Sequence, residues 1–200
     1  MGNKIIQIGP NRCGTRSLTR FFERNGISTV HWDGGLLAKR IAKRIILGQD
    51  PFLDYPTKNF FSDMELSATT AEPLLEMYKA FKYFYYWHPN AYYILNERAI
   101  DAWVASRAKH LGGQYIQNYK HFYSVDDISD VLELWKEDYV KHKRDVIDFF
   151  SERKAKFLIY NIEKDDTKKL KDFLFDEYQL TEEPLPRLND GNWIEKSRTL

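Results

Sequence analysis

The chain has 200 residues, 43% hydrophobic and 30% charged, which is typical of one globular domain with a sizeable core. Its formal net charge of +1 provides no global basic field, which argues against a nucleic-acid partner. Cys13 is the only cysteine, which excludes an intrachain disulfide and favours a reducing compartment. The first apolar run is too short for a signal peptide or a membrane span, so we expect a cytoplasmic protein.

Predicted strands and helices alternate along the chain. Short apolar runs that end at turn residues predict strands at 4–8, 27–32, 58–62, 92–96 and 156–162. Apolar stripes at helical spacing predict helices at 15–25, 36–47, 72–87, 101–110, 128–150 and 167–177, although the aromatic end of 72–87 would also suit a strand. The alternation predicts a single α/β domain over residues 1–200, with three layers and a mainly parallel central sheet flanked by helices.

The stretch Gly9-Pro-Asn-Arg-Cys-Gly-Thr-Arg-Ser17 joins the first predicted strand to the first predicted helix. Gly9 and Gly14 have the spacing of the loop G-x-x-x-x-G-K-[ST] that binds nucleoside triphosphates. Thr15 replaces its lysine and Arg16 its Ser/Thr, which disfavours a metal-dependent kinase or ATPase. Converging backbone N–H groups and the helix dipole still favour an anion here. The sequence therefore predicts a P-loop-like domain with a modified phosphate loop.

The side chains of this loop suit an anion. Gly14 can adopt the positive φ that such a loop needs, and Thr15 and Ser17 add hydroxyl donors. Arg12 and Arg16 add charge-assisted hydrogen bonds. Cys13 precedes an electropositive helix N-terminus, so we expect a lowered thiol pKa.

A second motif consists of Arg98, at the end of a predicted strand, and Ser106, eight residues later on the next predicted helix. Together with the first loop, it resembles the 3′-phosphoadenosine 5′-phosphosulfate (PAPS)-dependent sulfotransferases. That family has a 5′-phosphosulfate loop of the form P-K-x-G-T-x and a 3′-phosphate motif of Arg and Ser at this spacing. Shorter stretches are also similar to small bacterial-type members, at residues 31–35, 61–65 and 186–189.

The resemblance implies PAPS as cofactor, adenosine 3′,5′-bisphosphate as product, and no metal. It implies that Arg98 and Ser106 hold the 3′-phosphate, and that the 5′-phosphosulfate lies against Arg12, Cys13, Gly14, Thr15, Arg16 and Ser17. Arg12 stands where the family usually has lysine; it keeps the charge and adds a fork of donors. The family's C-terminal adenine loop has only a faint counterpart in Asp190-Gly-Asn-Trp193.

Sulfuryl transfer to a hydroxyl needs cations near the leaving phosphate and a base near the acceptor. Arg12 would supply charge. Four candidate bases follow predicted strand ends, and we rank Asp63 first because it directly follows the third strand. Glu65 and His31 come next, and then Asp33, which before Gly34-Gly35 is also typical of a turn.

The sequence thus favours a sulfotransferase that moves a sulfuryl group from PAPS to a hydroxyl of a small-molecule or carbohydrate acceptor. Two alternatives stay open: a P-loop nucleotide phosphotransferase, and a non-catalytic protein that binds a 3′-phosphorylated nucleotide. The acceptor and the oligomeric state are not determined. We interpret His142 as a packed residue, and one basic helix face as solvated, with Lys39, Arg40, Lys43 and Arg44.

Overall fold

The computed structural model describes residues 2–69, 71–181 and 183–186. A five-stranded sheet forms its centre, and every neighbouring pair of strands in this sheet is parallel. The strand order is β2-β3-β1-β6-β7. The bounds are β1 Ile5–Gln7, β2 Thr29–His31, β3 Phe60–Ser62, β6 Tyr92–Glu97 and β7 Lys156–Asn161. The predicted α/β class and the parallel sheet are confirmed.

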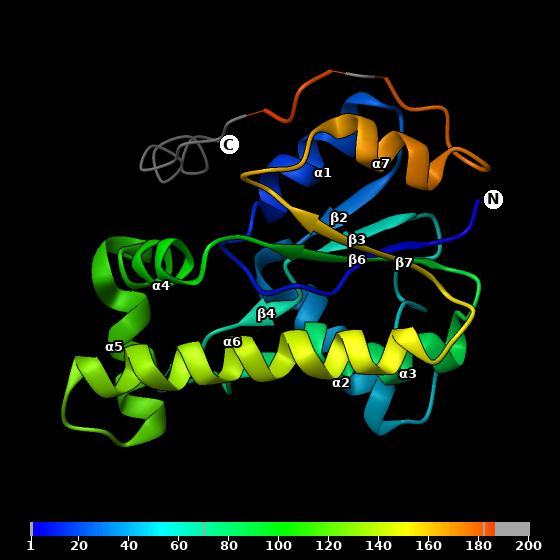
Figure 1. Cartoon of the computed structure of the whole chain (residues 1–200). Helices are drawn as coiled ribbons and strands as arrows, with labels where there is room; N and C mark the ends of the chain where they lie inside the picture. Colours follow the sequence, from blue (N-terminus) through cyan, green and yellow to red (C-terminus); the bar gives the residue numbers. More distant parts are fainter. Residues whose placement is uncertain (1, 70, 182, 187–200) are drawn as a thin grey trace, which may run out of the picture.

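Helices cover both faces of the sheet (Figure 1). On one face lie α1 (Thr15–Arg24) and α7 (Thr167–Leu174), and on the other α2 (Leu36–Ile46), α3 (Phe81–Trp87) and α6 (Ile128–Ser151). Successive strand residues point to opposite faces, so Ile5 packs in the core under α1 and α7 while Ile6 packs in the core under α2, α3 and α6. The strands are therefore apolar on both sides, as a covered parallel sheet requires.

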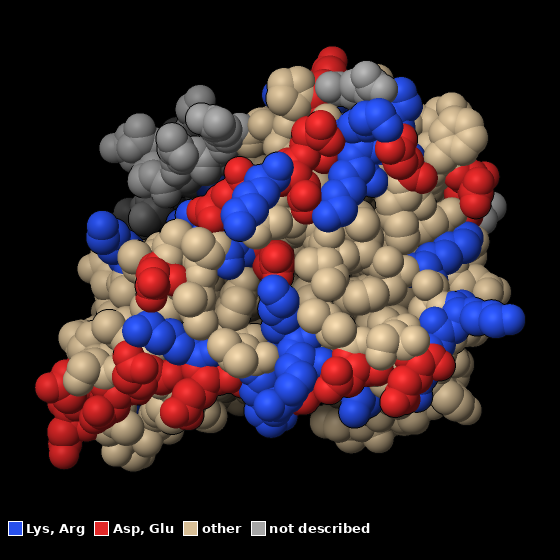
Figure 2. Space-filling model, in the orientation of Figure 1, with Lys and Arg blue, Asp and Glu red and all other residues tan. Residues whose placement is uncertain are grey.

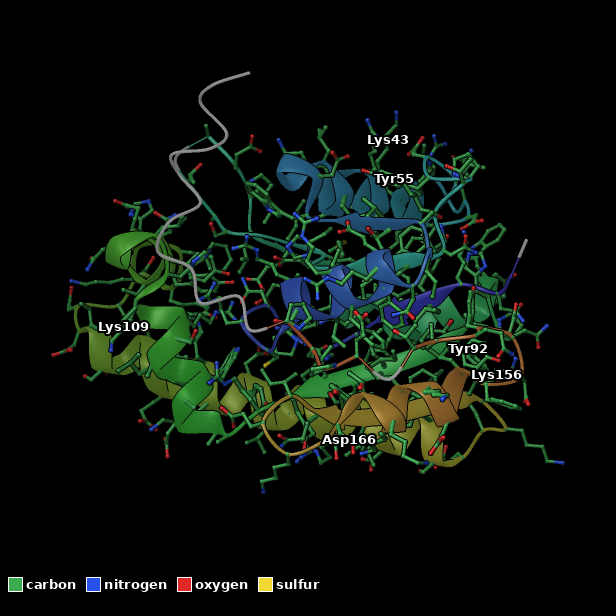
Figure 3. All side chains as sticks on the ribbon, turned by 90° about the horizontal axis from the view of Figure 1, so that it is seen from above. Lys43, Tyr55, Tyr92, Lys109, Lys156 and Asp166 are labelled. Atoms are coloured by element: carbon green, nitrogen blue, oxygen red, sulfur yellow. The ribbon has the colours of Figure 1, made fainter. Side chains whose placement is uncertain are left out.

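A helical extension lies beyond the carboxyl ends of the strands. It contains α4 (Ile100–Ala108), the 3₁₀ turn η3 (His110–Gly113), α5 (Gln114–Tyr123) and the first half of α6, around a core that includes Trp103 and Trp135. Figure 3 shows Lys109, just after α4, at the opposite end of the molecule from Tyr92 and Lys156, which begin β6 and β7. The loops that follow β1, β3 and β6 therefore face this extension.

One predicted helix is wrong in part, and one helix of the structure was not predicted. The helix predicted at 72–87 was wrong over its first half, where β5 (Leu75–Glu76) pairs with β4 (Glu65–Leu66) and the 3₁₀ turn η2 (Met77–Ala80) follows. The pairing of Glu65 with Glu76 across this hairpin outweighs local helical spacing. Helix α5 was missed, because Gly112-Gly113 and the polar start of the helix are typical of a loop. Gly113, with φ of 89°, precedes its first turn.

No helix within the described ranges is long and apolar enough to cross a membrane.

The approach of Gly9 to β6 fixes where the first loop begins. Its N–H donates to Asn96 Oδ1 at 3.0 Å, and a Cβ at this position would lie 2.2 Å from the backbone oxygen of Asn96. Only glycine fits this contact. The loop is thereby held at the carboxyl end of β1, between β3 and β6, where the chain switches from one half of the sheet to the other. Ligands of open parallel sheets bind at such a switch point.

We expect Gly9→Ala to destabilise the protein by about 2–3 kcal/mol more than Gly48→Ala, because the added methyl overlaps β6. Gly48 is the control, since it has φ of 65° and open space around it, so its replacement costs only the left-handed strain, about 1 kcal/mol. Urea denaturation of both variants measures the difference. Equal losses would contradict the close approach of Gly9.

Candidate functional site

The loop between β1 and α1 is held by hydrogen bonds to its carbonyl groups. Asn96 Nδ2 donates to the Cys13 oxygen at 2.7 Å, and Trp103 Nε1 donates to the Asn11 oxygen at 2.9 Å. Gly14 has φ of 75° and precedes α1, whose first turn has no side-chain cap and no acidic residue. The first amides of a helix have no acceptor within the helix, so this turn suits an anion.

The structure brings the second motif to this loop. Arg12 Nε donates to Ser106 Oγ at 3.2 Å, and Arg98 Nη1 donates to the Arg12 oxygen at 3.4 Å across 86 residues of sequence. Arg12 itself has φ of 62°, a conformation that non-glycine residues rarely adopt and that is typical of functional loops. The two predicted phosphate motifs therefore form one cationic edge.

Arg98 is engaged by a carboxylate. Its Nε and Nη2 donate to Glu163 Oε1 at 3.1 and 2.7 Å, and the Ala99 N–H donates to Glu163 Oε2 at 3.0 Å. Ala99 precedes α4, so this carboxylate accepts both the guanidinium fork and an amide at a helix N-terminus. These are the donors that a phosphate group would use. Sequence analysis missed Glu163.

His31 and Asp63 form a polar cluster at the ends of β2 and β3. Ser62 Oγ contacts His31 Nδ1 at 3.0 Å and Thr19 Oγ1 at 2.8 Å, while His31 Nε2 lies 3.5 Å from Asp63 Oδ2. Burial, together with Arg16, lowers the pKa of His31 to about 4, so at neutral pH this is a contact of a neutral ring and not an ion pair.

Asp63 is the best placed candidate base. Its side chain keeps 19% exposure, and it has φ of 54° directly after β3. Burial raises the pKa of Asp63 to about 6, while nearby Arg12, Arg107 and Arg16 act in the opposite direction. Asp63 is therefore ionised at neutral pH, close to the arginines of the loop, with a pKa suited to accepting a proton.

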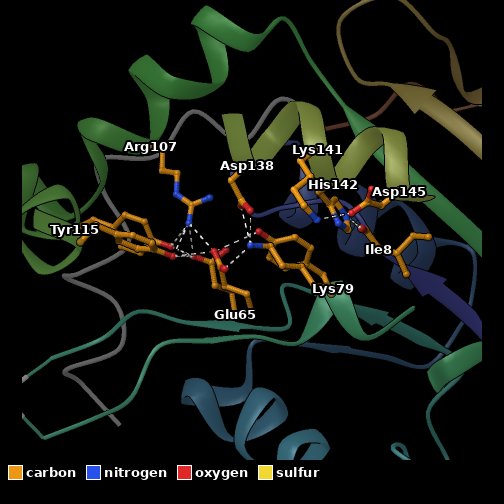
Figure 4. A network of polar contacts seen from close by, with 12 residues as sticks. Ile8, Glu65, Lys79, Arg107, Tyr115, Asp138, Lys141, His142 and Asp145 are labelled. Carbon is orange, nitrogen blue, oxygen red and sulfur yellow. Dashed lines mark hydrogen bonds and ion pairs between the residues drawn. The ribbon is translucent and has the colours of Figure 1, made fainter. Parts of the chain in front are cut away.

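Glu65, the second predicted base, lies in a buried network instead (Figure 4). Its Oε1 accepts hydrogen bonds from Arg107 Nη2 and the Tyr119 hydroxyl, both at 2.7 Å, and from the Tyr115 hydroxyl. The Glu65 side chain is 1% exposed, and burial raises its pKa while Arg107 opposes the rise. Because donors and packed rings surround it, Glu65 is suited to support and not to proton transfer.

This network reaches the loop. The Tyr115 hydroxyl accepts from Asn11 Nδ2 at 2.9 Å, so the Glu65–Arg107 pair and the loop share one partner. Arg107 directly follows Ser106 on α4, but its pairing with β4 left no signal in the sequence. The network connects the β4–β5 hairpin to the helical extension. It contacts the residues next to Ser106 and Arg12, namely Arg107 and Asn11, and so helps to fix the positions of this pair.

Cys13 corrects an expectation. The lowered thiol pKa was wrong: Cys13 is fully buried in the core of the helical extension, and this burial raises its pKa to about 12. Desolvation outweighs the nearby arginines. The thiol is packed in this core, and the Cys13 oxygen accepts from Asn96 Nδ2.

His110 was missed as a neighbour of the loop. It follows α4 in η3, with its ring 5.2 Å from that of Tyr115. Burial and the charges of Arg12, Arg107 and Arg16 lower the pKa of His110 to about 4. A neutral imidazole therefore lies close to the same arginines as Asp63.

The remaining candidates have structural partners. Asp33 accepts a hydrogen bond from the Tyr55 hydroxyl at 2.7 Å within the turn η1 (Asp33–Gly35), and buried His142 contacts the Ile8 oxygen through Nε2 at 2.7 Å. The packed interpretation of His142 is confirmed. Carboxylates from other segments pair with three cations of the basic face of α2, namely Lys39, Arg40 and Arg44.

Two stretches of the resemblance, residues 187–189 and 190–193, lie outside the described residues. On the face shown in Figure 2, acidic side chains gather at the lower left, while basic and acidic side chains are interspersed over the rest of the face. In the described part of the chain, no group of three His, Cys, Asp or Glu side chains is arranged to hold a metal ion.

No protein-family model matches the sequence, and no curated protein matches it significantly.

The buried pair gives a test of the support role. Arg107→Met should destabilise the protein by about 3–5 kcal/mol, because the Glu65 carboxylate would stay buried without its cation. The double variant Arg107→Met/Glu65→Gln should recover much of this loss, since the Glu65 charge is then removed and Glu76, 3.5 Å from Arg107, keeps its pair with Lys79. Urea denaturation measures all three proteins. A double variant as unstable as Arg107→Met alone would show that the ion pair is not the basis of the loss.

Proposed function

We propose that this protein is a PAPS-dependent sulfotransferase on a P-loop-like domain, acting on a hydroxyl of a small-molecule or carbohydrate acceptor. The observation that carries the proposal is the convergence of the two motifs: Arg12 contacts both Ser106 and Arg98 at the switch point of the sheet. A kinase-type loop has no need of this second pair, and the loop lacks the lysine that a triphosphate needs.

The residues fit a nucleotide that has phosphates on both the 3′ and the 5′ positions of its ribose. Around Arg98 and the Ala99 amide, an anion is already bound in the form of the Glu163 carboxylate. The start of α1, with Gly14 in the left-handed conformation, suits the second phosphate, next to Arg12 and Arg16. Two separate anion cradles on one edge match a 3′,5′-bisphosphate better than a 5′-triphosphate.

The chemistry divides among these residues. When bound, PAPS supplies a sulfuryl group that bonds to the acceptor oxygen as its bond to the 5′-phosphate oxygen breaks. Arg12, Arg16 and the first amides of α1 stabilise the negative charge of the leaving phosphate. Asp63 accepts the proton of the acceptor hydroxyl. Neutral His31 and Ser62 support the Asp63 side of the site through their mutual hydrogen bond.

Calorimetric titration tests the nucleotide site. Wild-type protein should bind adenosine 3′,5′-bisphosphate more tightly than 5′-AMP or ATP with Mg²⁺. Arg98→Ala should weaken bisphosphate binding by about tenfold to a hundredfold, the worth of charge-assisted hydrogen bonds, with little effect on 5′-AMP.

Arg153→Ala is the matched control, because it removes one positive charge beside the start of β7, at the other end of the sheet. Preference for ATP with Mg²⁺ would support the phosphotransferase alternative and overturn the proposal. Tight bisphosphate binding without transfer to any acceptor in a broad panel would support the non-catalytic alternative. Undiminished affinity in Arg98→Ala would remove Arg98 from the site.

The pH dependence of transfer tests the base. Because the pKa of Asp63 is raised to about 6, its basic form increases as the pH rises through 6, and the transfer rate should rise with it. Asp63→Asn should lower the rate by about 10²–10⁴-fold and abolish this rise, without weakening bisphosphate binding. If Asp63→Asn keeps the wild-type dependence of the transfer rate on pH, another group accepts the proton.

A further inference from the structure

The Glu163 carboxylate occupies the cradle that the proposed function assigns to the 3′-phosphate. Its Oε1 accepts hydrogen bonds from Arg98 Nε and Nη2, and its Oε2 accepts one from the Ala99 N–H, at 2.7–3.1 Å. Both side chains remain accessible, with 22% of Arg98 and 35% of Glu163 exposed. An incoming anion can therefore reach this pair from solvent.

The position of Glu163 is set by its own segment. The residue follows β7 in a turn where its N–H donates to Asn161 Oδ1 at 3.0 Å, and the Ile162 N–H donates to the Glu97 oxygen at 2.9 Å. The backbone is thus held beside the end of β6, while the carboxylate is joined only through a flexible side chain. Displacing it requires rotation about side-chain bonds and no change in the sheet.

We propose that Glu163 is a displaceable intramolecular competitor of the 3′-phosphate, which pairs with Arg98 in the empty site and weakens the binding of adenosine 3′,5′-bisphosphate. This inference rests on the proposed function. A phosphate dianion has more charge and more acceptor oxygens than a carboxylate, so it can replace Glu163 at the same donors. The contact gives Arg98 a counter-charge beside the Arg12 backbone, to which its Nη1 donates at 3.4 Å.

The contact also affects product release. A bisphosphate product that leaves must break its hydrogen bonds with Arg98. Glu163 then returns and accepts hydrogen bonds from the same Arg98 donors. Where product release limits turnover, such a competitor accelerates it. The hydrogen bond from the Ala99 N–H and the pair with Arg98 lower the pKa of Glu163, so the competitor is ionised at neutral pH.

Glu163→Gln tests the competition. It keeps an oxygen that can accept from the Ala99 N–H but removes the charge that Arg98 binds. Titration calorimetry should show tighter binding of adenosine 3′,5′-bisphosphate and of 3′-AMP, by up to about fivefold, the range of a partly exposed ion pair. Binding of 5′-AMP, which lacks the 3′-phosphate, should not change. Stopped-flow displacement should show slower release of the bisphosphate.

Glu152→Gln is the matched control, because it is the same chemical change in a pair with Arg153 at the other end of the sheet. If it tightens binding equally, or if 5′-AMP also binds more tightly, the effect is a general field and the competition is overturned. Unchanged or weaker bisphosphate binding in Glu163→Gln overturns it too. Glu163→Ala, with thermal unfolding to check its fold, must show the same sign.

These outcomes are separate from the failure of the proposed function. If wild-type protein and Glu163→Gln both fail to bind adenosine 3′,5′-bisphosphate and 3′-AMP, the nucleotide site itself is wrong, and the competition falls with it. If wild-type protein binds the bisphosphate and Glu163→Gln binds no better, the function stands and Glu163 is only a structural partner of Arg98.

Discussion

The candidate site depends on the side-chain amide of Asn96. Fully buried at the end of β6, it accepts the Gly9 N–H through Oδ1 and donates to the Cys13 oxygen through Nδ2. One amide thus holds both ends of the loop that joins β1 to α1. A buried amide left without these partners costs about 1–3 kcal/mol, so the loop and the strand fix each other. Arg12 and Gly14 flank Cys13, so these two hydrogen bonds also fix their positions.

Positive charge on this edge is opposed at short range by carboxylates of two kinds. The pair of Arg107 and Glu65 is 1% exposed on both sides, and its removal would leave a buried charge. The pair of Arg98 and Glu163 is partly exposed, so water competes with it. Burial therefore distinguishes an enclosed ion pair from one that solvent reaches, although both consist of an arginine and a glutamate.

Local patterns predicted the α/β class and most of the strands and helices. The strands and helices were found because each is a contiguous segment whose apolar spacing reports its faces. The loop from Gly9 to Ser17 was recognised for the same reason, since its spacing, its glycines and its place before a helix are all local. The hairpin β4–β5 and helix α5 were not found, because pairing and packing with distant segments decide them.

The sequence by itself determined the alternation of strands and helices, the place of the Gly9–Ser17 loop between a strand and a helix, and the spacing of Arg98 and Ser106. Tertiary structure alone decided which charges meet: Glu163 with Arg98, Glu65 with Arg107, and His110 near Arg12. It also decided that Cys13 is buried and its pKa raised, where the local pattern indicated the reverse. The physical reason is that burial and charge pairing are set by segments far apart in the chain, whose contacts leave no period or motif in the sequence.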